Sequence, residues 1–335
     1  MSGNVNKFVS SEGRCIYTFP VTVFPTLVAN IYIIDDGDRL TLIDSGSGMD
    51  FSNQEFVVGF GSLKDMYNLT FSLADLDAIL ITHGHTDHFG GLPFLRQFTQ
   101  APVGMHILDK RVLTNYGERV ILASHRLNSF LISAGVSEKH RQGLMGLYLW
   151  AKDRFQAQPV DFLLSEETVA PGDFQVYHVP GHCPGQVCLR VDDILLTADH
   201  VLSRITPHQA PESITNNMGL GHYLESLAKI ARLDGVSLGL GGHEDPILDL
   251  PARIEAIKVA HDRRLDRTLE ICQEPHTIAE ISKALFGKVE SYHVLLALEE
   301  AGAHVEYLHQ RDELVAVNLA EIEGEAQPVI RYIQA

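Results

Sequence analysis

Four side chains of the types that bind metal ions lie close together in residues 82–88, Thr-His-Gly-His-Thr-Asp-His. In an extended segment, residues two apart point to the same side, so His83 and His85 can bind one ion together. Asp87 and His88 follow where the chain is expected to turn, and they can face a second ion beside the first. Imidazole and carboxylate groups suit zinc or another first-row metal. The spacing therefore predicts a metal site.

The elements on either side of this stretch are expected to hold it in place. The apolar run Ala78–Ile81 has the length of a short buried strand, and Leu92–Phe98 has the pattern of a short helix. Gly84, Gly90 and Gly91 let the backbone pass close to the site. The candidate ligands are therefore expected on a turn from a strand to a helix.

The order His-x-His-x-Asp-His after a strand resembles the first metal motif of the metallo-β-lactamase-fold hydrolases. The resemblance implies a mixed α/β (α+β) fold, an αββα sandwich, with further metal ligands at later strand ends. Three such positions follow in the family's order: His182 in Gly-His-Cys-Pro-Gly, Asp199 in Ala-Asp-His, and His243 in Gly-Gly-His-Glu. Each follows a segment with the pattern of a strand, and a sandwich brings such ends together.

The resemblance also implies a dinuclear centre that holds two divalent metal ions. Zinc is the expected metal, with iron and manganese as alternatives. The implied ligands are His83, His85 and His182 for the first ion, Asp87, His88 and His243 for the second, and Asp199 as the bridge between them. Asp87 and Asp199 are the expected catalytic residues, and Asp87 can orient a metal-bound hydroxide nucleophile.

Four neighbouring residues have open roles. The resemblance implies that Asp44, at the end of the strand 39–44, supports the centre from outside the ligand set, whereas the alternative is an ordinary turn residue. Cys183 either lines the first metal site or packs beside it. His200 faces either substrate or solvent. Glu244 stands where many family members have glycine, which affects the shape of the loop but not the assignment of His243.

Composition limits the partners and the location of the protein. The chain has 335 residues, of which 45% are hydrophobic, and a formal net charge of −17. This charge disfavours binding to nucleic acid or to an anionic membrane and favours a small-molecule substrate. No apolar run reaches membrane-spanning length, residues 1–7 have no signal-like apolar core, and four scattered cysteines form no framework. We therefore expect a cytoplasmic protein, and a homo-oligomer is left open.

The pattern predicts two domains. Residues 1–250 form the catalytic domain, with a helical insert at about 109–158 that either packs on the sheet or forms an apolar lid containing Trp150. Residues 251–335 are expected to form a winged-helix-like domain, with helices at 252–272, 277–286 and 291–301 and strands at 305–308 and 314–317. Acidic residues outnumber basic ones there, which argues for packing rather than for DNA binding.

These observations favour a dinuclear hydrolase that acts on a thioester or lactone of a partly apolar small molecule. Cleavage of RNA phosphodiester bonds by an endoribonuclease of the same fold is the second reading. A mononuclear iron oxygenase of this fold is the third, although the full second set, Asp87, His88 and His243, argues for two ions. A non-catalytic binding protein with a vestigial site is the remaining alternative, and the complete ligand set argues against it.

Overall fold

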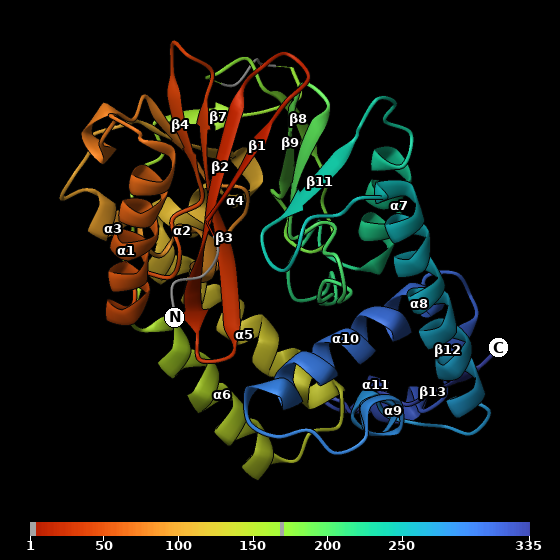
Figure 1. The fold of residues 1–335 in the computed structure, drawn as a ribbon. Coiled ribbons are helices and arrows are strands. Elements are labelled where there is room, and N and C mark those ends of the chain that lie inside the picture. Colours follow the sequence, from red (N-terminus) through yellow and green to blue (C-terminus); the bar gives the residue numbers. More distant parts are fainter. Residues whose placement is uncertain (1–4, 168–170) are drawn as a thin grey trace. The chain divides into compact units, whose positions relative to one another are not determined.

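The computed structural model describes residues 5–167 and 171–335. Residues 1–4, part of the segment 1–7 that has no signal-like apolar core, lie outside the described residues. The chain forms two compact units (Figure 1). The first unit comprises Met1–Tyr116, Phe155–Pro207 and Ser226–Ile254, and the second comprises Gly117–Arg154, His208–Glu225 and Glu255–Ala335. The contacts thus group most of the helical segment 109–158 with the C-terminal region, whereas the sequence pattern divides the chain at residue 250.

Two β-sheets pack face to face in the first unit (Figure 1). The larger sheet contains, in spatial order, β1 (Asn6–Val9), β2 (Cys15–Phe24), β3 (Leu27–Asp35), β4 (Leu40–Ile43), β5 (Ala78–Leu80), β6 (Val103–His106) and β7 (Phe162–Leu164). The smaller sheet contains, in spatial order, β11 (Leu238–Gly241), β10 (Ile194–Ala198), β9 (Val187–Val191) and β8 (Gln175–His178). Strands β4 to β7 run parallel, as do β10 and β11, and the other neighbours are antiparallel.

One buried core joins the two sheets. Ile34 and Leu80 of the larger sheet and Leu189 and Leu196 of the smaller sheet are at most 1% exposed within it. Burying each such side chain contributes about 1.5–3 kcal/mol. This packing fixes the ends of β5, β8, β10 and β11, and the segments that follow those four strands carry all seven candidate ligands.

Helices cover the outer faces of the sheets, so the expected αββα sandwich is confirmed (Figure 1). On the larger sheet, Phe56 of α1 (Asp50–Tyr67) packs edge-on against Phe19 of β2, with 5.1 Å between ring centroids. The sequence of residues 52–68 predicts a poorly periodic helix that breaks near Gly59 and Gly61, but α1 is continuous, so the predicted break is wrong. A Cβ at Gly59 would lie 2.5 Å from the Phe19 ring, so the glycine serves close packing within a continuous helix.

The remaining helical elements of the first unit are short. They are η1 (Leu73–Asp75), α2 (Thr86–Phe89), α3 (Leu92–Leu95) and α4 (Ile107–Thr114). Two longer helices, α7 (Leu220–Ile230) and α8 (Leu250–Ile271), pass from one unit into the other. In the first unit, Ser226 of α7 donates a hydrogen bond from Oγ to the carbonyl of Pro180 (2.8 Å).

The second unit is mainly helical. It contains α5 (Tyr116–Ser133) except its first residue, α6 (Glu138–Lys152), most of α8, α9 (Ile278–Phe286), α10 (Tyr292–His309), β12 (Leu314–Ala316), α11 (Leu319–Gly324) and β13 (Tyr332–Gln334). Helix α10 packs against α6 and α9. Thr277 and Glu280 form the capping box that begins α9.

The third helix of the C-terminal region is longer than expected. We predicted a strand at 305–308, but these residues continue α10, so that prediction is wrong. Ala301, Ala303, Val305 and Leu308 are all buried, and a helix buried on several sides has an apolar run that resembles a strand. Strand β12 pairs instead with β13. The three predicted helices are present, but α11 separates the two paired strands in sequence, so the predicted strand-turn-strand is not observed and the winged-helix assignment stays a prediction.

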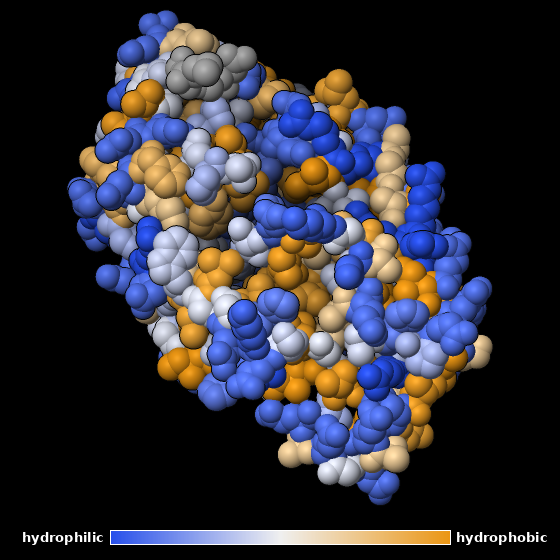
Figure 2. Space-filling model, turned by 90° about the horizontal axis from the view of Figure 1, so that it is seen from below, coloured by the Kyte–Doolittle hydropathy of each residue, from blue (hydrophilic) through white to orange (hydrophobic). Residues whose placement is uncertain are grey.

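The helices α5 and α6 expose several large apolar side chains. Ile121 and Trp150 are each 60% exposed, and α6 has no buried residue. On the face drawn in Figure 2, hydrophobic side chains are interspersed with hydrophilic ones. The proposed lid role of this segment stays a prediction. No helix in the described ranges is both long and apolar enough to span a membrane.

A buried carboxylate of α10 binds the segment that follows residue 207 in the second unit. Glu300 accepts a hydrogen bond from the amide of Gln209 (2.8 Å) and lies 3.2 Å from Nη1 of Arg264. The His208 ring lies 3.0 Å from the Glu299 carboxylate and 3.4 Å from that of Glu300. Burial alone would lower the pKa of His208, but these two carboxylates outweigh it and raise the pKa to about 9. Burial opposes ionisation of Glu300, yet His208 helps to hold its pKa at about 2.

This cluster predicts a pH-dependent stability. The His208 contribution is complete below its ordinary pKa of 6.5 and disappears as the pH rises through about 9. The Glu300 contribution is complete above its ordinary pKa of 4.5 and disappears as the pH falls toward about 2. Glu300→Gln should lower the free energy of unfolding by about 2–4 kcal/mol at pH 6, because it removes the carboxylate that pairs with Arg264 and one of the two carboxylates beside His208.

Urea denaturation between pH 4 and 9 measures this effect. The variant should also lose less stability than the wild type between pH 6.5 and 9. Glu290→Gln, at a carboxylate that is 76% exposed, is the matched control and should change little. Unchanged stability of Glu300→Gln at pH 6 would contradict the account.

Candidate metal centre

Three histidine nitrogens converge at the end of β5. His83 and His85 lie between this strand and α2, and His182 follows β8. The Nδ1 atom of His85 lies 3.1 Å from Nε2 of His83 and 3.0 Å from Nε2 of His182. Three nitrogens at this separation have the arrangement of ligands around one metal ion.

A second group lies beside the first. Asp87 and His88 occupy the first turn of α2, and His243 follows β11. The Oδ2 atom of Asp87 lies 3.5 Å from Nε2 of His243 and 3.8 Å from Nε2 of His88. All three residues are buried. One carboxylate and two imidazoles are also a common ligand set for a divalent first-row metal.

The carboxylate of Asp199 lies between the two groups. Its Oδ2 atom is 3.8 Å from Nε2 of His182 in the first group and 3.2 Å from Nε2 of His243 in the second. Its Oδ1 atom is 3.5 Å from Nε2 of His88. The structure therefore brings all seven candidate ligands together from four separate segments of the chain, with Asp199 between the two groups.

Hydrogen bonds from the outer ring nitrogens orient three of these histidines. His88 donates from Nδ1 to the carboxylate of Asp44 (2.7 Å), and His243 donates from Nδ1 to the carbonyl of Val28 (2.7 Å). His83 donates from Nδ1 to the hydroxyl of Thr82 (3.1 Å), which in turn donates to Asp44 (2.9 Å). In each case Nε2 is left for the centre, which is how metal-binding histidines are usually arranged. Asp44 thus contacts the centre through His88 rather than acting only as a turn residue.

The charge balance of the centre favours a cation. Burial opposes ionisation of Asp199, yet His243 and His88 hold its pKa well below the usual range. Burial alone would lower the pKa of His243, but Asp199 and Asp87 outweigh it and raise the pKa to about 10. The buried carboxylates therefore require positive charge among these residues, which protons or metal ions can supply.

Two buried atoms test whether a metal ion fits. Nε2 of His88 and Oδ1 of Asp199 have no hydrogen-bond partner among the described residues. Buried polar atoms without partners are costly, and a metal ion would give both atoms one. The donor set, the outward hydrogen bonds and these two atoms all fit divalent metal binding.

Glu244 keeps the loop of His243 in shape although it replaces glycine. It adopts a left-handed backbone with φ of 67°, the conformation that glycine adopts most easily. Its carboxylate accepts hydrogen bonds from the amides of Arg204 (2.6 Å) and Ile205 (3.2 Å). These bonds offset the strain and connect the loop after β11 to the loop after β10.

The structure also places Cys183 and His200, the other two residues that had open roles. His200 is fully buried, so the expectation that it faces solvent is wrong. Burial is the main cause of its low pKa, about 3. Cys183 is buried, and its Sγ atom lies within 4.8 Å of nitrogens of His83, His85 and His182. Burial raises the pKa of this thiol well above its usual range.

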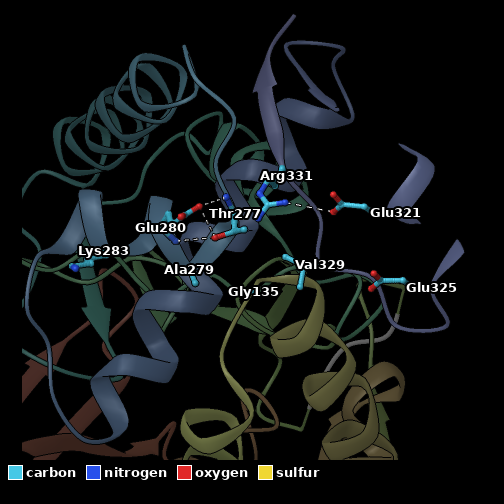
Figure 3. A pocket seen from close by; sticks show the side chains of 9 residues that line it. All are labelled: Gly135, Thr277, Ala279, Glu280, Lys283, Glu321, Glu325, Val329 and Arg331. Carbon is cyan, nitrogen blue, oxygen red and sulfur yellow. Dashed lines mark hydrogen bonds and ion pairs between the residues drawn. The ribbon is translucent and has the colours of Figure 1, made fainter. Parts of the chain in front are cut away.

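Two other features lie in the second unit, and neither contains a candidate ligand. The buried group His261, Glu300 and His304 has metal-binding residue types that the sequence motifs did not indicate, but Glu300 is already bound by Gln209 and Arg264. A pocket of about 460 Å³ is lined by charges of both signs (Figure 3). There, Arg331 pairs with Glu321, and Glu280 bonds to Thr277 (Figure 3).

Comparison with known proteins gives the family of this centre. The profile of the metallo-beta-lactamase superfamily matches residues 25–243, a span that contains all seven candidate ligands. The probable metallo-hydrolase YqjP of Bacillus subtilis (strain 168) is 20% identical over 299 residues, which cover 85% of this chain and 89% of that protein. A ribonuclease J of Mycoplasma genitalium is 29% identical over 100 residues, which cover 30% of this chain and 17% of that protein.

A solved structure has the same fold over nearly the whole chain. A metallo-beta-lactamase family protein from Thermus thermophilus is similar with a TM-score of 0.76 and 24% identity, covering 96% of this chain and 98% of that one. The family profile spans more than half of the residues, and the centre has the ligand types that its motifs predict. The chain is therefore a metallohydrolase that belongs to the metallo-β-lactamase superfamily.

Proposed function

We propose that this metallohydrolase is dinuclear and cleaves a thioester or lactone of a partly apolar small molecule. The observation that carries the two-metal proposal is the position of Asp199, within 4.0 Å of histidine nitrogens from both groups. The proposed ligands are His83, His85 and His182 for one ion, Asp87, His88 and His243 for the other, and Asp199 for both. Zinc is the proposed metal, with iron and manganese as alternatives.

When bound, such ions lower the pKa of water to about 7 and polarise the oxygen of the scissile group. The residues of the chain supply orientation and charge. Burial opposes ionisation of Asp87, but His88 and His243 together with His85 outweigh it and lower its pKa, so the carboxylate stays ionised near neutral pH. An ionised Asp87 can accept a hydrogen bond from an attacking water and hold it in line with the substrate. No nucleophilic serine or cysteine is required.

The choice of substrate rests on charge and on apolar surface. A net charge of −17 repels polyanions such as RNA at long range. The segment 109–158 carries exposed apolar side chains, including Trp150 and Ile121, which suit a partly apolar molecule. Phosphodiester cleavage in RNA is the second candidate reaction. The similarity of part of the chain to a ribonuclease J supports this candidate. A mononuclear iron oxygenase is the third, and the second ligand group argues against it.

The metal content of the purified protein tests the dinuclear centre. We expect about two divalent ions per chain in the wild type, measured by plasma mass spectrometry after dialysis. His85→Ala and His243→Ala should each retain about one, because each removes a ligand from a different group. His125→Ala, at an exposed position of α5, is the control and should retain two. One iron per chain in the wild type would contradict the dinuclear hydrolase, and a metal-free protein would contradict both enzyme readings.

A substrate panel tests the reaction. Acyl-CoA, acyl-glutathione, a lactone and RNA should be compared with wild type, His85→Ala and the His125→Ala control. We expect turnover of a thioester or lactone that His85→Ala lowers at least about 100-fold, because the ligand itself is lost. Metal-dependent cleavage of RNA alone would favour the second candidate. If no thioester or lactone reacted in a metal-dependent way, the substrate proposal would be wrong.

The hydrogen bond between Asp44 and His88 should strengthen zinc binding at the second group. Asp44→Asn removes the charged acceptor of His88 Nδ1–H, so zinc affinity should fall about 10–100-fold. Competition with a chromophoric chelator measures that affinity. Asp38→Asn, in the exposed turn between β3 and β4, is the matched control. Equal affinities for Asp44→Asn and the wild type would show that the hydrogen bond has no such role.

A further inference from the structure

A fully buried carboxylate outside the proposed ligand set lies against the first group of histidines. Asp109 is in the first turn of α4 and is 0% exposed. Its Oδ2 atom accepts a hydrogen bond from the amide of Gly84 (2.8 Å), and its Oδ1 atom accepts one from the amide of Gly185 (2.9 Å). The two oxygens therefore bind two separate loops.

Both loops carry proposed ligands of the same ion. Gly84 lies between His83 and His85, and Gly185 lies three residues after His182. A buried carboxylate that accepts two backbone N–H bonds is a strong and directional contact, because charge-assisted hydrogen bonds are about twice as strong as neutral ones. It fixes the backbone of each loop rather than a side chain.

The glycines fit this contact closely. A Cβ at Gly185 would lie 2.7 Å from the backbone nitrogen of Asp109 and 2.8 Å from its Cγ. A Cβ at Gly84 would lie 3.3 Å from the same carboxylate. Distances under about 3.0 Å force a shift, so alanine at residue 185 would displace Asp109 or the loop, while alanine at residue 84 would be milder.

We propose that Asp109 is a positioning residue that holds the His83–His85 loop and the His182 loop at the separation the first metal ion requires. Asp44 contacts His88 of the second group directly and His83 of the first group through Thr82, whereas the two amides bound by Asp109 lie in the segments of the first-group ligands His83–His85 and His182. The inference rests on the proposed two-metal assignment. It predicts a selective effect: loss of Asp109 should weaken the binding of the ion at the first group and not that of the ion at the second group.

The test measures zinc affinity at each group separately. His243→Ala leaves the first group intact, and His85→Ala leaves the second. Asp109→Asn is added to each, because asparagine keeps the size but has one acceptor oxygen and turns an NH₂ donor toward the other amide. We expect zinc affinity to fall about 10–100-fold in the His243→Ala background and to change less than about 3-fold in the His85→Ala background. Chelator competition gives the affinities, and thermal unfolding of the metal-free proteins records general stability.

Gly185→Ala is the second variant, because it leaves every ligand and charge in place and disturbs only the fit to Asp109. It should give the same selective loss, and Gly84→Ala a smaller one. Gly143→Ala, where a Cβ meets nothing within 4 Å, is the matched control and should change neither affinity. If Asp109→Asn does not fold, the two glycine variants decide the question.

The outcomes separate the inference from the function on which it rests. A selective loss at the first group supports the positioning role. Equal losses in both backgrounds, or no loss in either, would overturn it while leaving a two-metal wild type intact. A wild type that binds fewer than two zinc ions would instead overturn the proposed function, and the inference with it.

Discussion

A buried carboxylate is costly unless positive charge lies nearby. The metal centre of this protein depends on how that charge is supplied to Asp199. Its two oxygens lie within 4.0 Å of nitrogens of His83, His88, His182 and His243. Those residues are far apart in sequence, so the carboxylate can be stabilised only when two packed sheets bring the ends of β5, β8, β10 and β11 together. The fold thus produces the cluster, and the need of its buried carboxylates for positive charge favours cations there.

In the loops around the centre, carboxylates stabilise strained backbone conformations. Asp44 and Glu244 both have positive φ, at 60° and 67°, which is costly for residues other than glycine. Each carboxylate then accepts hydrogen bonds from neighbouring amides: Asp44 from Thr82, and Glu244 from Arg204 and Ile205. The carboxylate of Asp109 also accepts hydrogen bonds from two backbone amides, but its own backbone is not strained. Rigid loops place ligands accurately, and this accuracy is what orientation of a reacting water demands.

The sequence was sufficient for those features that depend on local pattern. Residues 82–88 revealed four candidate ligands because their spacing is short, and the helix predicted at 277–286 is present as α9, which begins after Thr277. Gly59 and residues 305–308 were misread, because packing on Phe19 and burial on several sides are tertiary facts. The grouping of 117–154 with the C-terminal region and the contacts of Asp109 left no signal either, since one acid in a first helical turn is common. The family and the supporting contact of Asp44 could be predicted, whereas the contacts of Asp109 could not.

Anomalous X-ray diffraction from crystals of the zinc-loaded protein tests the central claim most directly. The account predicts two zinc peaks about 3.5–4 Å apart, one on each side of the Asp199 carboxylate. One peak should lie among His83, His85 and His182, and the other among Asp87, His88 and His243. A single peak, or ions bound away from Asp199, would contradict the two-metal centre.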